Sequence, residues 1–123
     1  MEHQRDYPIL ILQQERGFRV LLTAHACRRV HERRPDLWDA TRWRVAEPFK
    51  LDLAARGCAL KALGVRGECK LVVNGLRVVY DMSNSAARIV TVMTLPVMTP
   101  DEVSGLKRVN RFQRNESHVQ ERK

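Results

Sequence analysis

Residues 23–36, TAHACRRVHERRPD, gather side chains that could bind and cleave a phosphodiester. The stretch holds two histidines, whose charge changes near neutral pH, and four arginines, whose planar guanidinium groups suit bidentate phosphate contacts. Cleavage of RNA without a metal ion requires a base for the 2′-hydroxyl, cations for the phosphorane charge and an acid for the leaving 5′-oxygen. This stretch supplies a residue type for each of these tasks.

A helix over residues 24–34 would position these side chains, because Thr23 can cap its start and Pro35 must end it. At 100° per residue, one face carries the polar set His25, Arg28, Arg29 and Glu32, and the opposite face, for the core, carries Ala26, Cys27 and Val30. His31 lies at the boundary and is expected to pack there. His25 and Arg29 are therefore candidate catalytic residues, and Arg28 is a candidate phosphate binder. In the simpler alternative, Arg28 and Glu32 form an ordinary i,i+4 ion pair and His25 is only solvated or capping.

Short strands and further helices are expected around this helix. The run ILILQQERGFRVLLT predicts two strands around a turn at residues 15–17. Pro35 suits the first position of a second helix over residues 35–46, in which Trp43 is expected to pack. A third helix is expected from Pro48, because apolar residues from Leu51 to Leu63 follow the i, i+3, i+4, i+7 rule and Gly64 suits the position after its end.

The C-terminal half carries the clearest pattern. CKLVVNGLRVVYDM is two β-rich runs joined by Asn74-Gly75, the preferred pair of a type I′ hairpin, and RIVTVMTL supplies a third strand. TPDE at residues 99–102 predicts a last helix that ends near Arg114. We therefore expect an α+β fold: an antiparallel sheet made of a three-strand C-terminal meander and an N-terminal strand or hairpin, with two or three helices on one face and a C-terminal helix. Residues 1–115 are expected to form one domain, followed by a polar tail at 116–123.

The chain is strongly basic. Its 22 Lys and Arg against 14 Asp and Glu give a net charge of +8, and 17 of the 22 are Arg. A GC-rich genome would also raise the arginine content, but such an excess favours a polyanionic partner, nucleic acid first and an acidic protein second. On the last helix, a basic stripe is as typical of a solvated face as of nucleic-acid docking: Lys107, Arg108, Arg111 and Arg114.

Several classes of protein are disfavoured by what the sequence lacks. No apolar run approaches the ~20 residues of a membrane span, and the first residues lack the features of a signal peptide, so we expect a cytoplasmic protein with no membrane partner. Cys27, Cys58 and Cys69 are expected to be small core residues, because their spacing suits neither a disulfide framework nor a zinc site. Neither a metal nor another cofactor is expected.

Part of the sequence resembles ribonuclease toxins. The stretch LKALGVRGECKLVVNGLRVVYDMSNSAARIVTVMTL resembles the C-terminal half of RelE-type toxins, in which a strand with a basic residue is followed by a tight turn, an R-V-V-Y strand and a hydrophobic strand. The start TAHACRR also resembles the T-x-H-A-x-x-R helix start of small BrnT-like proteins of the same ribonuclease superfold. The resemblance covers roughly residues 18–95.

This resemblance implies an RNA-binding, metal-independent endoribonuclease of a toxin–antitoxin-like system. It points to Lys70 and Arg77 as the residues of the hairpin that contact phosphate, with Arg77 in the catalytic set, and it implies that Tyr80 is buried. Arg66, in the loop before the hairpin, is a further candidate for RNA binding. The expected partners are RNA and an acidic antitoxin or another acidic protein that covers the basic face.

One difference from the toxins favours an alternative. RelE-type enzymes commonly carry a basic residue and a tyrosine after the last strand, whereas this chain continues TLPVMTPDEV. The alternative is a non-enzymatic basic module on the same scaffold, either a nucleic-acid binder or a phage- or mobile-element-encoded inhibitor of an acidic host protein. An antitoxin-like regulator is disfavoured, because the sequence contains no helix-turn-helix or disordered neutralising tail. The enzyme hypothesis depends on whether His25 and Arg77 come together in space.

Overall fold

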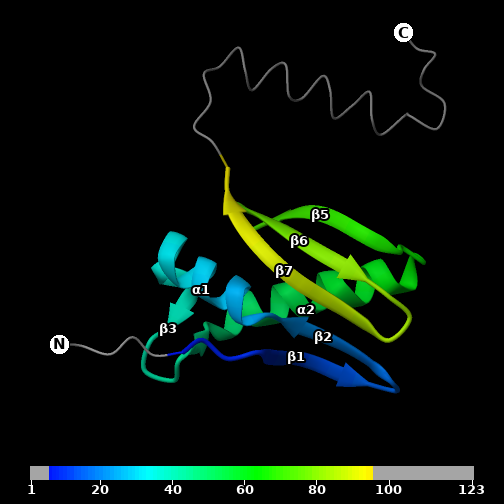
Figure 1. The fold of residues 1–123 in the computed structure, drawn as a ribbon, viewed down its shortest axis with the longest axis horizontal. Helices are drawn as coiled ribbons and strands as arrows, with labels where there is room; N and C mark the ends of the chain where they lie inside the picture. Colours follow the sequence, from blue (N-terminus) through cyan, green and yellow to red (C-terminus); the bar gives the residue numbers. More distant parts are fainter. Residues whose placement is uncertain (1–5, 96–123) are drawn as a thin grey trace, which may run out of the picture.

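The computed structural model describes residues 6–95 of the 123-residue chain. This part forms a five-stranded sheet, a two-stranded ribbon and two α-helices, so the expected α+β class is confirmed (Figure 1). In chain order the elements are β1 (Leu10–Glu15), β2 (Phe18–Leu22), α1 (Ala24–Arg33), the 3₁₀ turn η1 (Pro35–Leu37), β3 (Trp38–Asp39), β4 (Arg44–Val45), α2 (Glu47–Ala62), β5 (Gly67–Val73), β6 (Leu76–Met82) and β7 (Ala86–Thr94). Neither helix of the described part is long and apolar enough to cross a membrane.

The sheet has the strand order β1-β2-β7-β6-β5. Strands β5, β6 and β7 form the expected antiparallel meander, and β1 pairs antiparallel with β2. The expectation of a wholly antiparallel sheet is wrong at one junction, where β2 pairs with β7 in parallel. The reason lies in the connection, because both helices and the four strands β3 to β6 separate β2 from β7, and such a long crossover can bring the chain back in the same direction.

Two tight turns set the register of the hairpins. Between β1 and β2, Arg16 and Gly17 have φ values of 50° and 80°, and between β5 and β6, Asn74 and Gly75 have values of 52° and 81°. Positive φ at both central residues is the requirement of a type I′ turn, which glycine and asparagine meet at low steric cost. Both hairpins predicted from the sequence are therefore confirmed.

Helix α1 begins and ends where its sequence predicts. The side-chain oxygen of Thr23 accepts a hydrogen bond from the N–H of Ala26 at 3.2 Å, and the helix ends two residues before Pro35. The Thr23 hydroxyl also donates to the carbonyl of Ile89 at 3.0 Å, which fixes the start of α1 beside β7. The buried residues of the helix are Ala26, Cys27 and Val30, the face that the sequence assigned to the core.

Helix α2 confirms the third predicted helix but buries a different face. Leu51 and Leu63, expected to be buried, are 57% and 77% exposed. The buried residues are instead Phe49, Leu53, Ala54, Gly57 and Leu60. Alanine and leucine occur all around this helix, so its periodicity does not select one face. Gly57 determines which face is buried, because the absence of a side chain lets the helix approach Val20 and Ala87 of the sheet.

The helix expected over residues 35–46 is wrong. Pro35 opens only the short turn η1, after which β3 and β4 form a two-stranded ribbon. Trp38 and Val45, which pair across this ribbon, are both buried. Aromatic and β-branched residues are good strand formers, and here their burial in the ribbon outweighs the helical spacing.

A single apolar core lies between the helices and one face of the sheet. It combines α1 and α2 with the inward residues of all five strands, including Val20, Ile89 and Tyr80. Residues 100–114, expected as a last helix, and the tail at 116–123 lie outside the described residues.

Candidate nucleic-acid interface

The face of the sheet opposite the helices, here called the open face, carries alternate residues of every long strand. By register, Lys70, Val79 and Thr91 form one row across β5, β6 and β7, and Val72, Arg77 and Met93 form the next. A third row holds Glu68, Asp81 and Arg88, with Leu21 of β2 beside Arg88. A depression on this face is lined by Glu68, Lys70, Val79, Asp81, Val90, Thr91 and Met93. The open face therefore carries apolar side chains with cationic side chains among them.

Arg77 stands out among the cations of the open face. Its side chain is exposed, and its neighbours across the strands are Val72 and Met93. No carboxylate of the described residues forms an ion pair with it, whereas Lys70 lies 3.8 Å from the Glu68 carboxylate and Arg88 faces Asp81. Arg77 is therefore available to an external anion.

Two arginines on the open face were not among the sequence candidates. Arg19 lies between buried Phe18 and buried Val20 on β2, and Arg88 lies between buried Ala87 and buried Ile89 on β7. The signal that could have found them is strict alternation, since residues i and i+2 of a strand share a face. Once β2 and β7 are neighbours, both arginines lie on the same face as Arg77.

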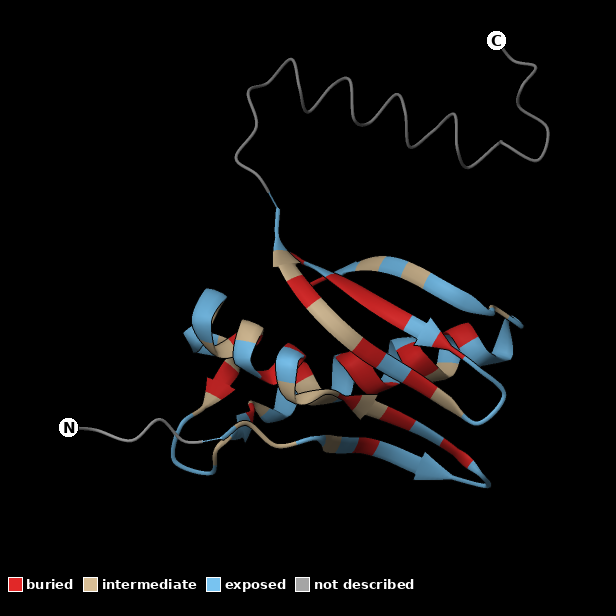
Figure 2. Ribbon diagram, in the orientation of Figure 1, coloured by how far each residue is buried: buried red, intermediate tan, exposed pale blue. Residues whose placement is uncertain are grey.

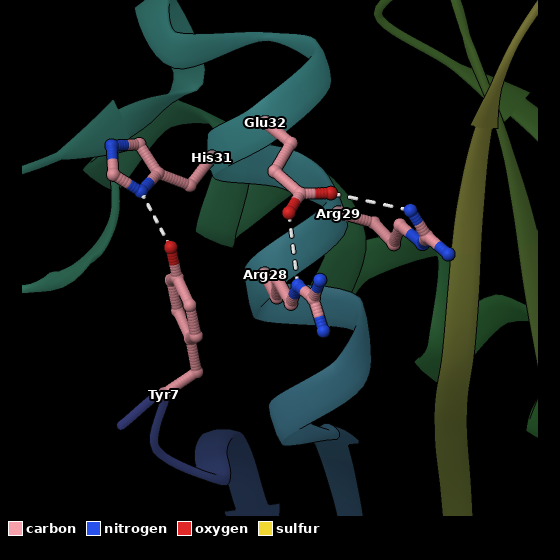
Figure 3. Close-up of polar contacts among 5 residues, drawn as sticks. All are labelled: Tyr7, Arg28, Arg29, His31 and Glu32. Carbon is pink, nitrogen blue, oxygen red and sulfur yellow. Dashed lines mark hydrogen bonds and ion pairs between the residues drawn. The ribbon is translucent and has the colours of Figure 1, made fainter. Parts of the chain in front are cut away.

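On α1 the polar face predicted from the sequence exists. Arg28 Nε lies 2.9 Å from a Glu32 oxygen, and Arg29 Nη1 lies 3.2 Å from the other oxygen (Figure 3). The hydrogen bond from Arg28 lowers the pKa of the Glu32 carboxyl below its usual range. Because Glu32 stays ionised and neutralises part of this charge, the two arginines are weaker anion binders than Arg77.

His25 is exposed at the start of α1, one turn before Arg29. Arg29 leaves the helix on the side of β7 (Figure 3). Because residues i and i+4 share a helix face, His25 lies on that side too. Beside them the register between β6 and β7 shifts, and Val90 is the extra residue. The Thr23 hydroxyl lies 3.3 Å from the Val90 carbonyl, so the helix start is attached to this bulge.

The structure does not bring His25 into contact with Arg77. His25 and Arg29 lie on one side of β7, and Arg77 lies on β6 on the other side of that strand. Lys70 is close to Arg77, on the neighbouring strand of the same face, and Arg66 is exposed just before β5. Lys107, Arg108 and Arg111 lie outside the described residues. The described candidates therefore form two groups. His25 and Arg29 lie on α1 beside β7, here called the rim, and Lys70 and Arg77 lie on the open face.

A cluster of four rings occupies the opposite side of α1. Tyr7, His31, Trp38 and Trp43 pack with ring centroids between 5.1 and 5.9 Å apart. The Tyr7 hydroxyl and His31 Nδ1 are 2.9 Å apart (Figure 3). Trp43 Nε1 donates to the Asp6 carbonyl. His31 and Trp43 are therefore packing residues, as expected, although the ribbon that holds Trp43 was not predicted.

Arg34 connects the end of α1 to the turn of the C-terminal hairpin. Its guanidinium donates to the Asn74 carbonyl at 2.6 Å and to both oxygens of Asp36 at 2.9 Å. The hydrogen bond from Arg34 lowers the pKa of Asp36. This arginine holds the helix and the hairpin in a fixed relation, so it positions the two candidate groups rather than contacting a ligand.

The buried nucleophilic side chains are not part of either group. Burial raises the pKa of Cys27 to about 12, so its thiol stays protonated. Burial likewise raises the pKa of Tyr80, whose hydroxyl donates to the Leu53 carbonyl at 2.8 Å. Within residues 6–95, no three His, Cys, Asp or Glu side chains are grouped so that they could hold a metal ion.

Comparison with known proteins gives no match, whether to protein-family models, to curated proteins or to solved structures. The resemblance to RelE- and BrnT-like toxins therefore stays a prediction from the motifs quoted above.

Proposed function

We propose that the protein binds RNA on the open face of its sheet and cleaves it, without a metal ion, at the rim beside α1. The observation that supports binding is the exposed Arg77, which has no ion-pair partner within residues 6–95 and is set among Val72, Met93 and further cations. Arginine pairs with phosphate in a bidentate manner, and apolar side chains beside it can contact unstacked bases. A nucleotide chain is long enough to contact Arg77 with one phosphate and the rim with another.

At the rim, His25 would exchange a proton with the 2′-hydroxyl or the leaving oxygen, and Arg29 would stabilise the phosphorane. The exposed position of His25 at the start of a helix leaves room for a phosphate beside it. The helix dipole adds a favourable potential for an anion at this end, where the first turn carries no acidic residue.

Cleavage of a labelled RNA by the purified protein in EDTA tests this proposal. We expect His25→Ala to lower the cleavage rate by about 100-fold or more, the usual contribution of a general acid or base, while RNA binding is retained. Arg77→Ala should weaken RNA binding. Arg42→Ala is the matched control, because Arg42 is exposed on the β3–β4 loop and belongs to neither group. Cleavage that survives unchanged in His25→Ala would contradict the assignment of the rim.

The second candidate is a binding module without catalysis. Its support is that within residues 6–95 no hydrogen bond orients the His25 ring, and that Glu32 partly neutralises Arg29. Wild-type protein that binds RNA through Arg77 but leaves it intact would establish this candidate. Binding to an acidic protein but not to RNA would replace both candidates with an inhibitor that uses the same open face.

A further inference from the structure

Within the described part of the chain, the strand β5 forms an edge of the sheet that no other segment covers. It pairs with β6 along all seven residues, from Gly67↔Met82 to Val73↔Leu76, with no bulge and no proline. No backbone group of residues 6–95 bonds to its other side. The opposite edge strand, β1, is interrupted by a register shift between Ile11 and Gln13, which is a common way to blunt an edge. Figure 2 shows β5 mostly exposed or half-buried beside the buried β6.

The hairpin turn determines which backbone groups of β5 point outward. In a two-residue type I′ hairpin the residues that flank the loop, Val73 and Leu76, exchange both hydrogen bonds. Alternate residues of β5 therefore bond to β6, and the intervening ones, Glu68, Lys70 and Val72, direct N–H and C=O groups away from the sheet. The side chains of these same three residues lie on the open face and are exposed.

We propose that β5 pairs antiparallel with β5 of a second copy of this chain, in a symmetric register centred on Cys69. In this register Glu68 of each copy lies opposite Lys70 of the other, so both cross-strand pairs are attractive. A register centred on Lys70 would oppose two lysines, and one centred on Glu68 would oppose two glutamates. The exposed Val72 then lies just beyond Gly67, the first residue of β5 in the second copy, where the alkyl stem of the preceding Arg66 can cover it.

The proposed pairing extends the sheet without turning it over. The residue numbers of opposed residues differ by an even number, as for Glu68 and Lys70, so opposed side chains come from the same face of each sheet. The open faces of both copies therefore lie on one side and the helices on the other. The outward backbone groups of Glu68 and Lys70 supply the new hydrogen bonds, and few residues take part. Association is therefore expected to be weak and dependent on protein concentration.

Charge reversal tests the register by sedimentation of the full-length protein at rising concentration. Glu68→Lys opposes two lysines and Lys70→Glu opposes two glutamates, so each variant alone should associate about tenfold more weakly. A mixture of the two variants should associate like wild type, because each lysine then meets a glutamate. The double variant should also associate. Equal association of all variants, or a monomeric wild type, would overturn the proposal.

Cys69 gives an independent readout of the same register. In a non-hydrogen-bonded antiparallel pair the two Cα atoms lie about 4.5 Å apart, which a disulfide can span. Oxidation of the two thiols by diamide should therefore give a covalent dimer that Cys69→Ser abolishes and Cys58→Ser preserves. Cross-linking through Cys58, or cross-linking of Lys70→Glu as fast as wild type, would contradict the pairing. A peptide partner on this edge instead of a second copy would leave the purified chain monomeric.

Discussion

Tyr80 is the largest fully buried side chain of the described residues, and its hydroxyl joins the sheet to α2 by a 2.8 Å bond to the Leu53 carbonyl. The burial of this tyrosine agrees with what the resemblance of the R-V-V-Y strand to RelE-type toxins implied. A buried hydroxyl must have a partner, and the Leu53 carbonyl provides it at a point where the helix crosses the strand. The same burial removes Tyr80 from any role at the surface.

At this scale we predict that Tyr80→Phe lowers the free energy of unfolding by about 1 kcal/mol, because the variant loses one buried hydrogen bond but leaves no large cavity. Urea denaturation followed by circular dichroism measures the change. Tyr7→Phe is the control, since its hydroxyl is only partly buried against His31, and a smaller loss is expected. A loss at Tyr80 no larger than that at Tyr7 would show that the bond to Leu53 contributes little.

At the scale of elements, the contact of α2 with the sheet depends on a glycine. A Cβ at Gly57 would lie 2.9 and 3.0 Å from the two Cγ atoms of Val20 and 3.3 Å from the Cβ of Ala87. Such distances force backbone or core side chains to shift. The glycine that weakens this helix as an isolated segment is therefore the residue that lets it pack closely.

We predict that Gly57→Ala destabilises the protein by about 1–2 kcal/mol, although alanine favours a helix by about 1 kcal/mol, because overpacking outweighs propensity. Thermal or urea unfolding measures this. In a Val20→Ala background the clash is removed, and the same change should be neutral or stabilising, so the double-mutant cycle should show strong coupling. Additive effects would show that the contact between Gly57 and Val20 does not limit the packing of α2.

At the scale of the whole molecule, the cationic side chains behind the net charge of +8 are not equally available to a ligand. Several arginines of the described part are engaged by carboxylates, as in the pairs Arg28–Glu32 and Arg34–Asp36. The open face keeps Arg77 unpaired within residues 6–95 and adds Arg19 and Arg88. The proposed affinity for RNA therefore resides in the arrangement of a few cations rather than in the total charge.

The salt dependence of RNA binding tests this view. Each phosphate contact on a single strand contributes about −0.7 to the slope of log K against log salt. We predict that Arg77→Gln makes this slope shallower by about that amount and that Arg42→Gln leaves it unchanged. Equal changes in both variants would mean that RNA responds to total charge and not to the open face. Fluorescence anisotropy with a short single-stranded RNA measures the slope.

Local signals in the sequence determined much of this protein. Thr23 and Pro35 define α1, and Asn74-Gly75 and Arg16-Gly17 define two hairpins, because capping and turn geometry depend on a few neighbouring residues. The polar face of α1 followed from helical periodicity in the same way, whereas the burial of Tyr80 was what the resemblance to RelE-type toxins implied.

Only the tertiary structure decided the rest. It replaced the helix at residues 35–46 with the ribbon of β3 and β4, since burial of Trp38 outweighs helical spacing. It also set β2 parallel to β7, which brought Arg19 and Arg88 onto the face of Arg77, and it placed β7 between His25 and the strand β6 that carries Arg77. Strand order and the facing of α2 depend on contacts between residues far apart in the chain, and local patterns carry no information about them.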